Sequence, residues 1–132
     1  IGKEIDDITV WLGFISQEEA AVEWANMDIA LIPSTLESES FGVSAVEAQA
    51  CGTPVIITDI PGLMEATIPE ESCIVVKRNS EREIYEAILL LYNNYELRKK
   101  YGSVGRRFVS ENFEINKCFY HIQMLFENYI CE

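Results

Sequence analysis

The residues best placed to do chemistry gather where a loop, Pro33 to Phe41, gives way to a helix-like stretch that begins at Gly42. A glycine at this point lets a ligand come close to the backbone. The first N–H groups of a helix have no carbonyl partner within it, and together with the positive end of the helix dipole they favour a phosphate. The same residues could form an ordinary connection capped by Gly42, so this feature alone leaves both interpretations open.

Two carboxylates beside this glycine indicate what else the ligand would carry. Glu39 lies just before the helix, and Glu47 lies about five residues into it, roughly 7 Å along its axis. An ionised carboxylate only accepts hydrogen bonds, so its natural partners here are the hydroxyl groups of ribose or of a sugar next to a diphosphate. Glu47 has apolar neighbours in sequence and would need a partner if buried, although a solvated position is equally open. The pattern suggests a nucleotide sugar.

The composition limits the classes of partner. The 132 residues include 22 acidic and 10 basic side chains, a formal net charge of −12, which disfavours nucleic acid and anionic membranes. No apolar run approaches the ~20 residues that span a bilayer, and the first residues lack the features of a signal peptide. We therefore expect a cytoplasmic protein without a transmembrane segment. Any contact with the inner membrane would come from a domain outside this sequence.

The cysteines do not form a metal site. They are widely spaced and include no C-x-x-C pair, and the chain has 1 histidine. A structural zinc site therefore lacks a set of ligands, and we expect four reduced thiols and no bound metal. The four residues are Cys51, Cys73, Cys118 and Cys131.

Strand-like and helix-like segments alternate in the first part of the chain. Ser16 with Glu19 and Ser80 with Glu83 have the S-x-x-E spacing of capping boxes, so helices should begin near Gln17 and Glu81. A further helix should run from about Gly42 to Cys51, ended by Gly52. Four short β-branched runs predict strands buried on both faces: Thr9–Leu12, Ile29–Ile32, Val55–Thr58 and Ile74–Val76.

This alternation predicts βαβ crossovers and hence an α/β fold, a Rossmann-like, doubly wound parallel sheet with helices on both faces. Its ligands should bind at the carboxyl ends of the strands, in the loops Pro33–Phe41 and Asp59–Glu65. We expect one domain over residues 1–132, truncated at its N-terminus because only four strands are visible and such a half usually has about five or six. Residues 80–131 should form its helical C-terminal part, in stretches Glu81–Asn94, Leu97–Val109 and Asn112 onward.

The stretch from Glu39 to Ile56, ESFGVSAVEAQACGTPVI, resembles the E-x7-E signature of group 1 glycosyltransferases, the retaining family 4 type with the GT-B fold. Its two glutamates are separated by seven residues. The flanks agree, because Val10–Phe14 resembles the family's strand ending in F-L-G and Asp28–Ser34 its D-x-hydrophobic-P-S strand. Gly62–Glu65 resembles the family's G-G-x-x-E loop.

The resemblance implies the C-terminal, donor-binding half of a glycosyltransferase that uses a nucleoside diphosphate sugar, UDP- or GDP-linked, without a cofactor or metal. Glu39 would face the donor sugar as the catalytic residue, and Glu47 would bind the ribose. Backbone N–H groups near the sugar and diphosphate would come from Phe41, Gly42, Val43 and Gly62.

Two departures from the family pattern concern the diphosphate. Pro61 replaces the first glycine of the G-G pair, so one N–H donor is lost. The family's basic diphosphate clamp matches no residue before Val10.

The acceptor domain would belong to the same parent chain, so the 132 residues alone should transfer no sugar.

The last helix carries more aromatic surface than a small sheet can cover. An exposed apolar patch or a homodimer is therefore expected there. The aromatic residues concerned are Phe113, Phe119, Phe126 and Tyr129.

Two alternatives stay open. A nucleotide-sugar epimerase or phosphorylase has the same fold and differs in its products. A non-enzymatic flavodoxin-like or receiver-like domain would carry an acidic cluster at the end of its first strand. The corresponding residues here, Leu12 to Phe14, include no carboxylate.

Overall fold

Three short parallel strands form the sheet of the computed structural model, which describes residues 8–36 and 41–130. The strands are β1 (Ala30–Ile32), β2 (Val55–Thr58) and β3 (Cys73–Val76), in the order β1-β2-β3. Ile32 pairs with Ile57 and Ile57 with Val75, so the carboxyl ends of all three strands lie at one edge. This confirms a parallel α/β sheet.

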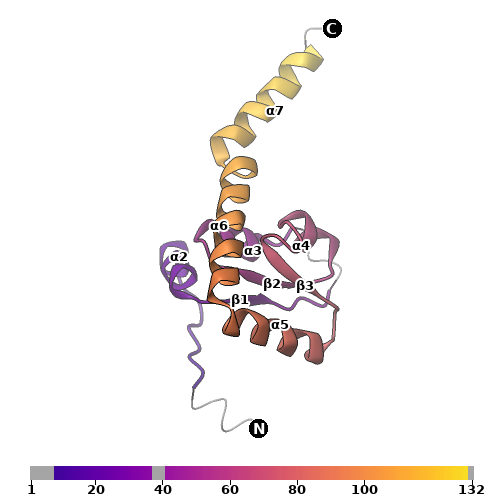
Figure 1. Cartoon of the computed structure of the whole chain (residues 1–132). Helices are drawn as coiled ribbons and strands as arrows, with labels where there is room; N and C mark the ends of the chain where they lie inside the picture. Colours follow the sequence, from indigo (N-terminus) through magenta and orange to yellow (C-terminus); the bar gives the residue numbers. More distant parts are fainter. Residues whose placement is uncertain (1–7, 37–40, 131–132) are drawn as a thin grey trace.

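Helices cover both faces of the sheet (Figure 1). One face carries α2 (Gln17–Asn26), α3 (Val43–Ala50) and α4 (Pro61–Glu65). The other face carries α5 (Glu81–Asn93) and the beginning of α6 (Tyr95–Asn112). The layered arrangement confirms the expected fold class.

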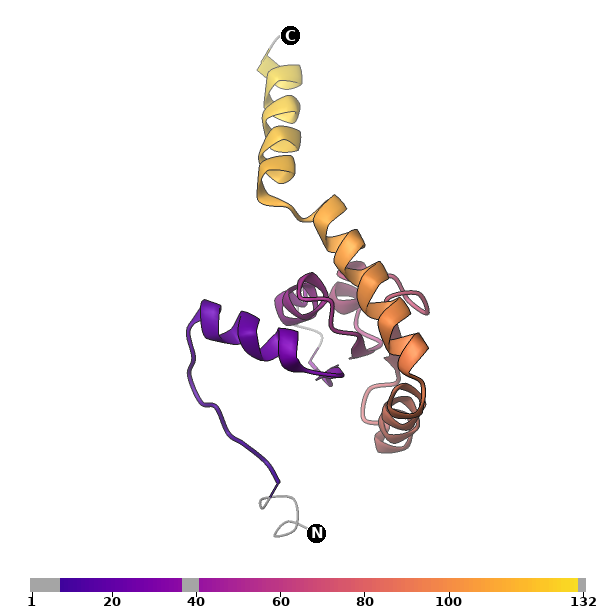
Figure 2. The ribbon, with the colours of Figure 1, turned by 60° about the vertical axis from the view of Figure 1, so that its left-hand side comes forward.

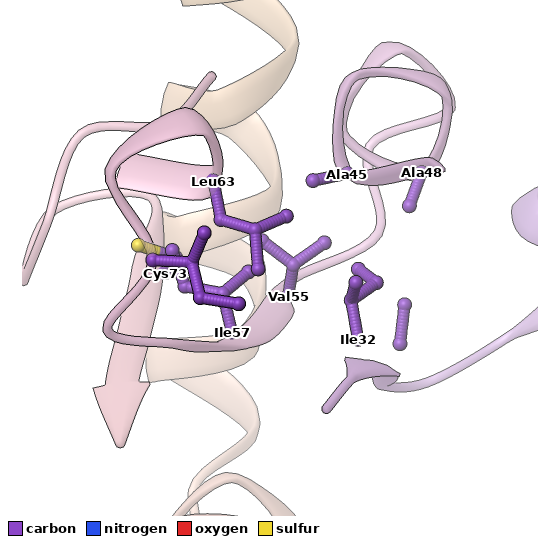
Figure 3. Packing of buried hydrophobic residues seen from close by; sticks show 9 residues of the cluster. Ile32, Ala45, Ala48, Val55, Ile57, Leu63 and Cys73 are labelled. Atoms are coloured by element: carbon purple, nitrogen blue, oxygen red, sulfur yellow. The ribbon is translucent and has the colours of Figure 1, made fainter. Parts of the chain in front are cut away.

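The first of these faces holds the larger buried cluster (Figure 3). Ala45 and Ala48 of α3 and Leu63 of α4 meet Val55 and Ile57 of β2, and all five are fully buried. Small residues on α3 let the helix lie close to the sheet, which fixes the position of its N-terminus relative to the strand ends.

The expectation of strands buried on both faces holds only for β2. All four of its residues are buried, whereas Leu31 in the middle of β1 is 38% exposed. In the described residues β1 pairs only with β2, on one side. Leu31 points to the face opposite Ala30 and Ile32, at this edge of the sheet, and is only partly covered there.

The strand expected at Thr9–Leu12 is absent, so this prediction was wrong. The segment has no regular structure, and Val10 and Trp11 are 78% and 84% exposed. In the usual doubly wound strand order 3-2-1-4-5-6, strand 3 lies at the edge of the sheet and strand 4 lies beside strand 1. Strands 3 and 4 therefore follow one another in the chain without being paired. An apolar run becomes a strand only when its backbone groups are paired, and none of the three described strands pairs with it.

Helices begin directly after Ser16 and Ser80, as predicted, but only Ser16 forms a complete capping box. Ser16 accepts from the Glu19 N–H (3.2 Å) and the Glu19 carboxylate accepts from the Ser16 N–H (2.8 Å), a complete capping box. Ser80 caps Glu83 in the same way, but the Glu83 carboxylate accepts from the Lys77 N–H instead.

Several helix boundaries differ from prediction, among them that of the last helix, which begins at Ile115 rather than Asn112 because the helix before it continues to Asn112. Residues Asp59–Glu65, expected as a loop, contain the short helix α4, for which Pro61 at its first position was the available signal. α6 begins at Tyr95 rather than near Leu97, because the Asn94 side chain accepts from the Leu97 N–H and caps it.

The terminal helix α7 (Ile115–Ile130) extends away from the rest of the chain (Figures 1 and 2). Its side chains up to Phe126 are largely exposed, as expected for an apolar patch. The most exposed apolar members are Ile115, Phe119, Tyr120, Leu125 and Phe126. No helix within residues 8–36 and 41–130 combines the length and apolar character needed to cross a membrane.

Candidate functional site

The beginning of α3 requires a glycine for two independent reasons. Gly42 is the N-cap and has a left-handed backbone (φ 70°, ψ 49°), which side-chain-bearing residues rarely adopt. A Cβ at this position would also lie 2.5 Å from Cδ2 of Leu63. Its carbonyl accepts from the N–H groups of Ala45 and Val46, so the helix begins at Val43 with its first donors lacking helical partners.

Glu47 lies one turn further along α3 and faces an open hollow between α2 and α3. The hollow has a volume of about 130 Å³. Its wall is apolar where Trp24 and three alanines line it, and polar where Gln17 and Glu47 reach it. Glu47 is half-buried there, between the solvated and the buried position that the sequence left open. The remaining lining residues are Ala20, Ala21, Ala50 and Cys51.

Gln17 was missed by reasoning from the sequence. It is the first residue of α2, 30 positions before Glu47, and no spacing rule connects them. Its amide can both donate and accept, which suits the edge of a nucleobase or a hydroxyl group. The Ser16 capping box places it at this hollow by fixing where α2 begins.

Gly62 lies in α4 rather than in a loop, and the packing of Leu63 brings it near Gly42. The Cα of Leu63 would be 3.5 Å from a Cβ on Gly42, so the backbone of α4 runs close to the start of α3. The two glycines predicted near the diphosphate therefore belong to one region. Pro61, at the first helical position, contributes no N–H to it.

Phe41 is held by aromatic contacts that the sequence did not reveal. Its ring lies 5.2 Å from that of Phe113 in an edge-to-face arrangement, and Phe113 contacts Phe108 of α6 in the same way at 5.5 Å. Such pairs are favoured by the quadrupoles of the rings. The contact anchors the backbone that leads into Gly42 against the end of α6.

Ion pairing and hydrogen bonds fasten the strand ends together. The Thr58 hydroxyl donates to the Ser34 carbonyl (2.6 Å), joining the ends of β1 and β2. Asp59 accepts from the Arg78 N–H (2.8 Å), and the Arg78 guanidinium lies 3.4 Å from the same carboxylate oxygen. Arg78 is thus a basic residue at the carboxyl edge of the sheet whose charge is offset by Asp59.

Glu39, predicted to face the donor sugar, lies outside the described residues. Within the described ranges, no group of three or more His, Cys, Asp or Glu side chains could hold a metal ion. Cys51, Cys73 and Cys118 are free thiols, and Cys131 lies beyond the described part of the chain.

Comparisons with known proteins identify the family. The family model for group 1 glycosyl transferases matches residues 2–108. An uncharacterized glycosyltransferase of Methanocaldococcus jannaschii is 37% identical over 116 residues, which are 88% of this chain and 32% of that protein. The chain thus spans only about a third of the length of this relative.

Solved structures have the same fold. Sucrose-phosphate synthase from Thermosynechococcus elongatus superposes with a TM-score of 0.86 and 29% identity, covering 95% of this chain and 31% of that one. Anabaena HepE, solved in complex with UDP-glucose, has a TM-score of 0.80 and 22% identity, covering 89% and 31%. Together with the E-x7-E stretch and the parallel sheet, the family match shows that this chain belongs to the group 1 glycosyltransferases and forms part of a GT-B fold.

Proposed function

We propose that this chain is the donor-binding half of a retaining glycosyltransferase, which moves a sugar from a nucleoside diphosphate sugar to an acceptor hydroxyl. The observation that carries the proposal is the position of Glu47. It lies on an open, mostly apolar hollow, one turn along a helix whose first N–H groups are unpaired within it. One region thereby offers an acceptor for hydroxyl groups and donors for phosphate.

In this proposal Glu47 accepts from the ribose hydroxyls, and the hollow beside α2 receives the nucleoside. Backbone N–H groups of Phe41, Gly42 and Val43 meet the sugar and diphosphate, and that of Gly62 adds a further donor. Anabaena HepE, which shares the fold, was solved with UDP-glucose. A UDP- or GDP-linked sugar is accordingly the proposed donor.

The proposed transfer depends on stabilising the negative charge that develops on the departing diphosphate. As the bond to the anomeric carbon breaks, negative charge grows on the departing diphosphate, and oriented N–H groups stabilise it at no cost of reorganisation. Pro61 has no backbone N–H, so one such donor is absent. We propose that basic groups from other parts of the parent protein supply the rest of this stabilisation, with no resident metal or cofactor.

Product analysis on the full-length parent tests this function against its closest rivals. With a donor sugar and an acceptor, a transferase forms a new glycoside and releases nucleoside diphosphate. A hydrolysing epimerase would consume water and release nucleoside diphosphate and an epimerised free sugar. A phosphorylase would cleave a glycosidic bond with inorganic phosphate and release a sugar phosphate and the alcohol. Binding of flavin, or phosphorylation by a small phosphodonor, would instead favour the non-enzymatic alternative.

Replacing Glu39 by alanine in the parent is expected to lower turnover more than it weakens binding of the nucleoside diphosphate. A group that faces only the sugar makes no contact with a ligand that lacks one. The measurement compares the affinity for UDP or GDP with the affinity for the intact donor and with kcat. Equal losses for the diphosphate and the donor would place Glu39 on the nucleotide.

We further propose that the acceptor domain belongs to the same parent and that α7 packs against it, in a cytoplasmic protein. The purified 132-residue chain is then expected to transfer no sugar, because an active site between two domains lacks half its contacts.

With its apolar face uncovered, α7 should cause concentration-dependent self-association, measurable by sedimentation. Phe119→Ser on α7 should reduce this association, whereas Ser103→Ala on α6 should not. Transfer by the isolated chain would contradict the proposal.

A further inference from the structure

Gln49 is a fully buried polar side chain that forms hydrogen bonds within its own helix and to two other segments. Its amide nitrogen donates to the Ala45 carbonyl (3.1 Å) and to the Ala66 carbonyl (2.9 Å), and its oxygen accepts from the Ser72 hydroxyl (2.8 Å). The Ser72 oxygen in turn accepts from the Ile68 N–H (2.9 Å). Both amide hydrogens and the amide oxygen are therefore satisfied inside the core.

These bonds fasten the far end of α4 to α3. Ala66 is the C-cap of α4, and Gln49 is near the end of α3. In the middle of α4, the fully buried Leu63 packs on Gly42. Since α4 has only five residues, these two attachments define its position beside α3. A polar bond of fixed length and direction specifies this position more narrowly than apolar contact alone.

We propose that Gln49 is a positioning residue for the diphosphate: it holds the backbone at Gly62 in place beside the first N–H groups of α3. The inference rests on the proposed function. It assigns Gln49 no contact with the donor, because the side chain is buried. No residue of α4 lines the hollow at Glu47, so the nucleoside and the diphosphate depend on different supports.

The test compares UDP with uridine for the full-length parent and its Gln49→Met variant. Methionine is unbranched and of similar length, so it fills the same space without the amide. UDP affinity should fall roughly tenfold, as for the loss of one hydrogen bond to a charged group. Uridine affinity, followed by NMR titration, should stay unchanged. If the wild type prefers GDP, GDP and guanosine take the place of UDP and uridine.

Two further variants separate positioning from loss of stability. Ile56→Val lies in the core on the opposite face of the sheet and should lower the melting temperature without changing UDP affinity. Ser72→Ala removes the donor to the Gln49 oxygen and should give a smaller loss for UDP only. It also serves as the test if Gln49→Met fails to fold.

A loss confined to UDP supports the inference. Unchanged UDP affinity, or equal losses for UDP and uridine, overturns it while the proposed function stands. A full-length parent that binds neither UDP nor GDP overturns the proposed function and this inference together.

Discussion

Replacing Gly102 by alanine is expected to lower the free energy of unfolding by about 2 kcal/mol, although alanine is the better helix former. Gly102 lies in α6 and is buried where this helix crosses the end of α3. A Cβ there would overlap the carbonyl oxygen of Gly52, and its carbonyl carbon would be 3.0 Å away. Backbone atoms cannot rotate aside as a side chain would, so α6 must move off α3.

The magnitude follows from two opposing effects. Alanine gains about 1 kcal/mol over glycine in a helix interior. Overpacking against a closely packed core costs about 3 kcal/mol at the upper end of its usual range, and a backbone obstacle belongs at that end. Gly105→Ala should cost less, because its Cβ would meet the side chain of Gln49 at 2.9 Å rather than backbone.

Urea unfolding of the purified chain measures these differences. Ser103→Ala is the matched control, since Ser103 is exposed on the same helix. It should leave the free energy of unfolding nearly unchanged. A Gly102→Ala chain as stable as the wild type would mean that α6 does not approach Gly52 as closely as described.

Replacing Glu47 by glutamine is expected to weaken binding of the nucleoside diphosphate by roughly 1.5 to 3 kcal/mol, the worth of a hydrogen bond to a charged group. The substitution keeps the size and shape of the side chain and removes only its charge. Because Glu47 is half-buried at an open hollow, the amide can remain solvated and the fold should be unaffected. The loss therefore reports on the ligand contact itself.

Titration calorimetry with UDP and GDP measures this effect. Glu86→Gln makes the same change in net charge on α5, on the opposite face of the sheet, and should leave the affinity unchanged. Equal affinities of wild type and Glu47→Gln would show that Glu47 does not bind the ribose. Equal losses in both variants would point to net charge rather than to a specific contact.

Local interactions explain which elements could be predicted from the sequence. Val55–Thr58 is a strand over the predicted residues, because its β-branched run is buried on both faces in the middle of the sheet. The Ser16 box fixed the start of α2 through bonds between residues three positions apart. Thr9–Leu12 has the same composition as a strand but lacks a partner among the described strands, which its own residues cannot supply.

The sequence by itself determined that Gly42 precedes a helix and that Glu47 lies one turn inside it, because capping and helical spacing act over a few residues. Only the tertiary structure decided what surrounds them. Gln17 shares the hollow with Glu47, and Leu63 brings α4 against Gly42. Such contacts join residues far apart in the chain, and they depend on how the helices pack on the sheet rather than on any local pattern.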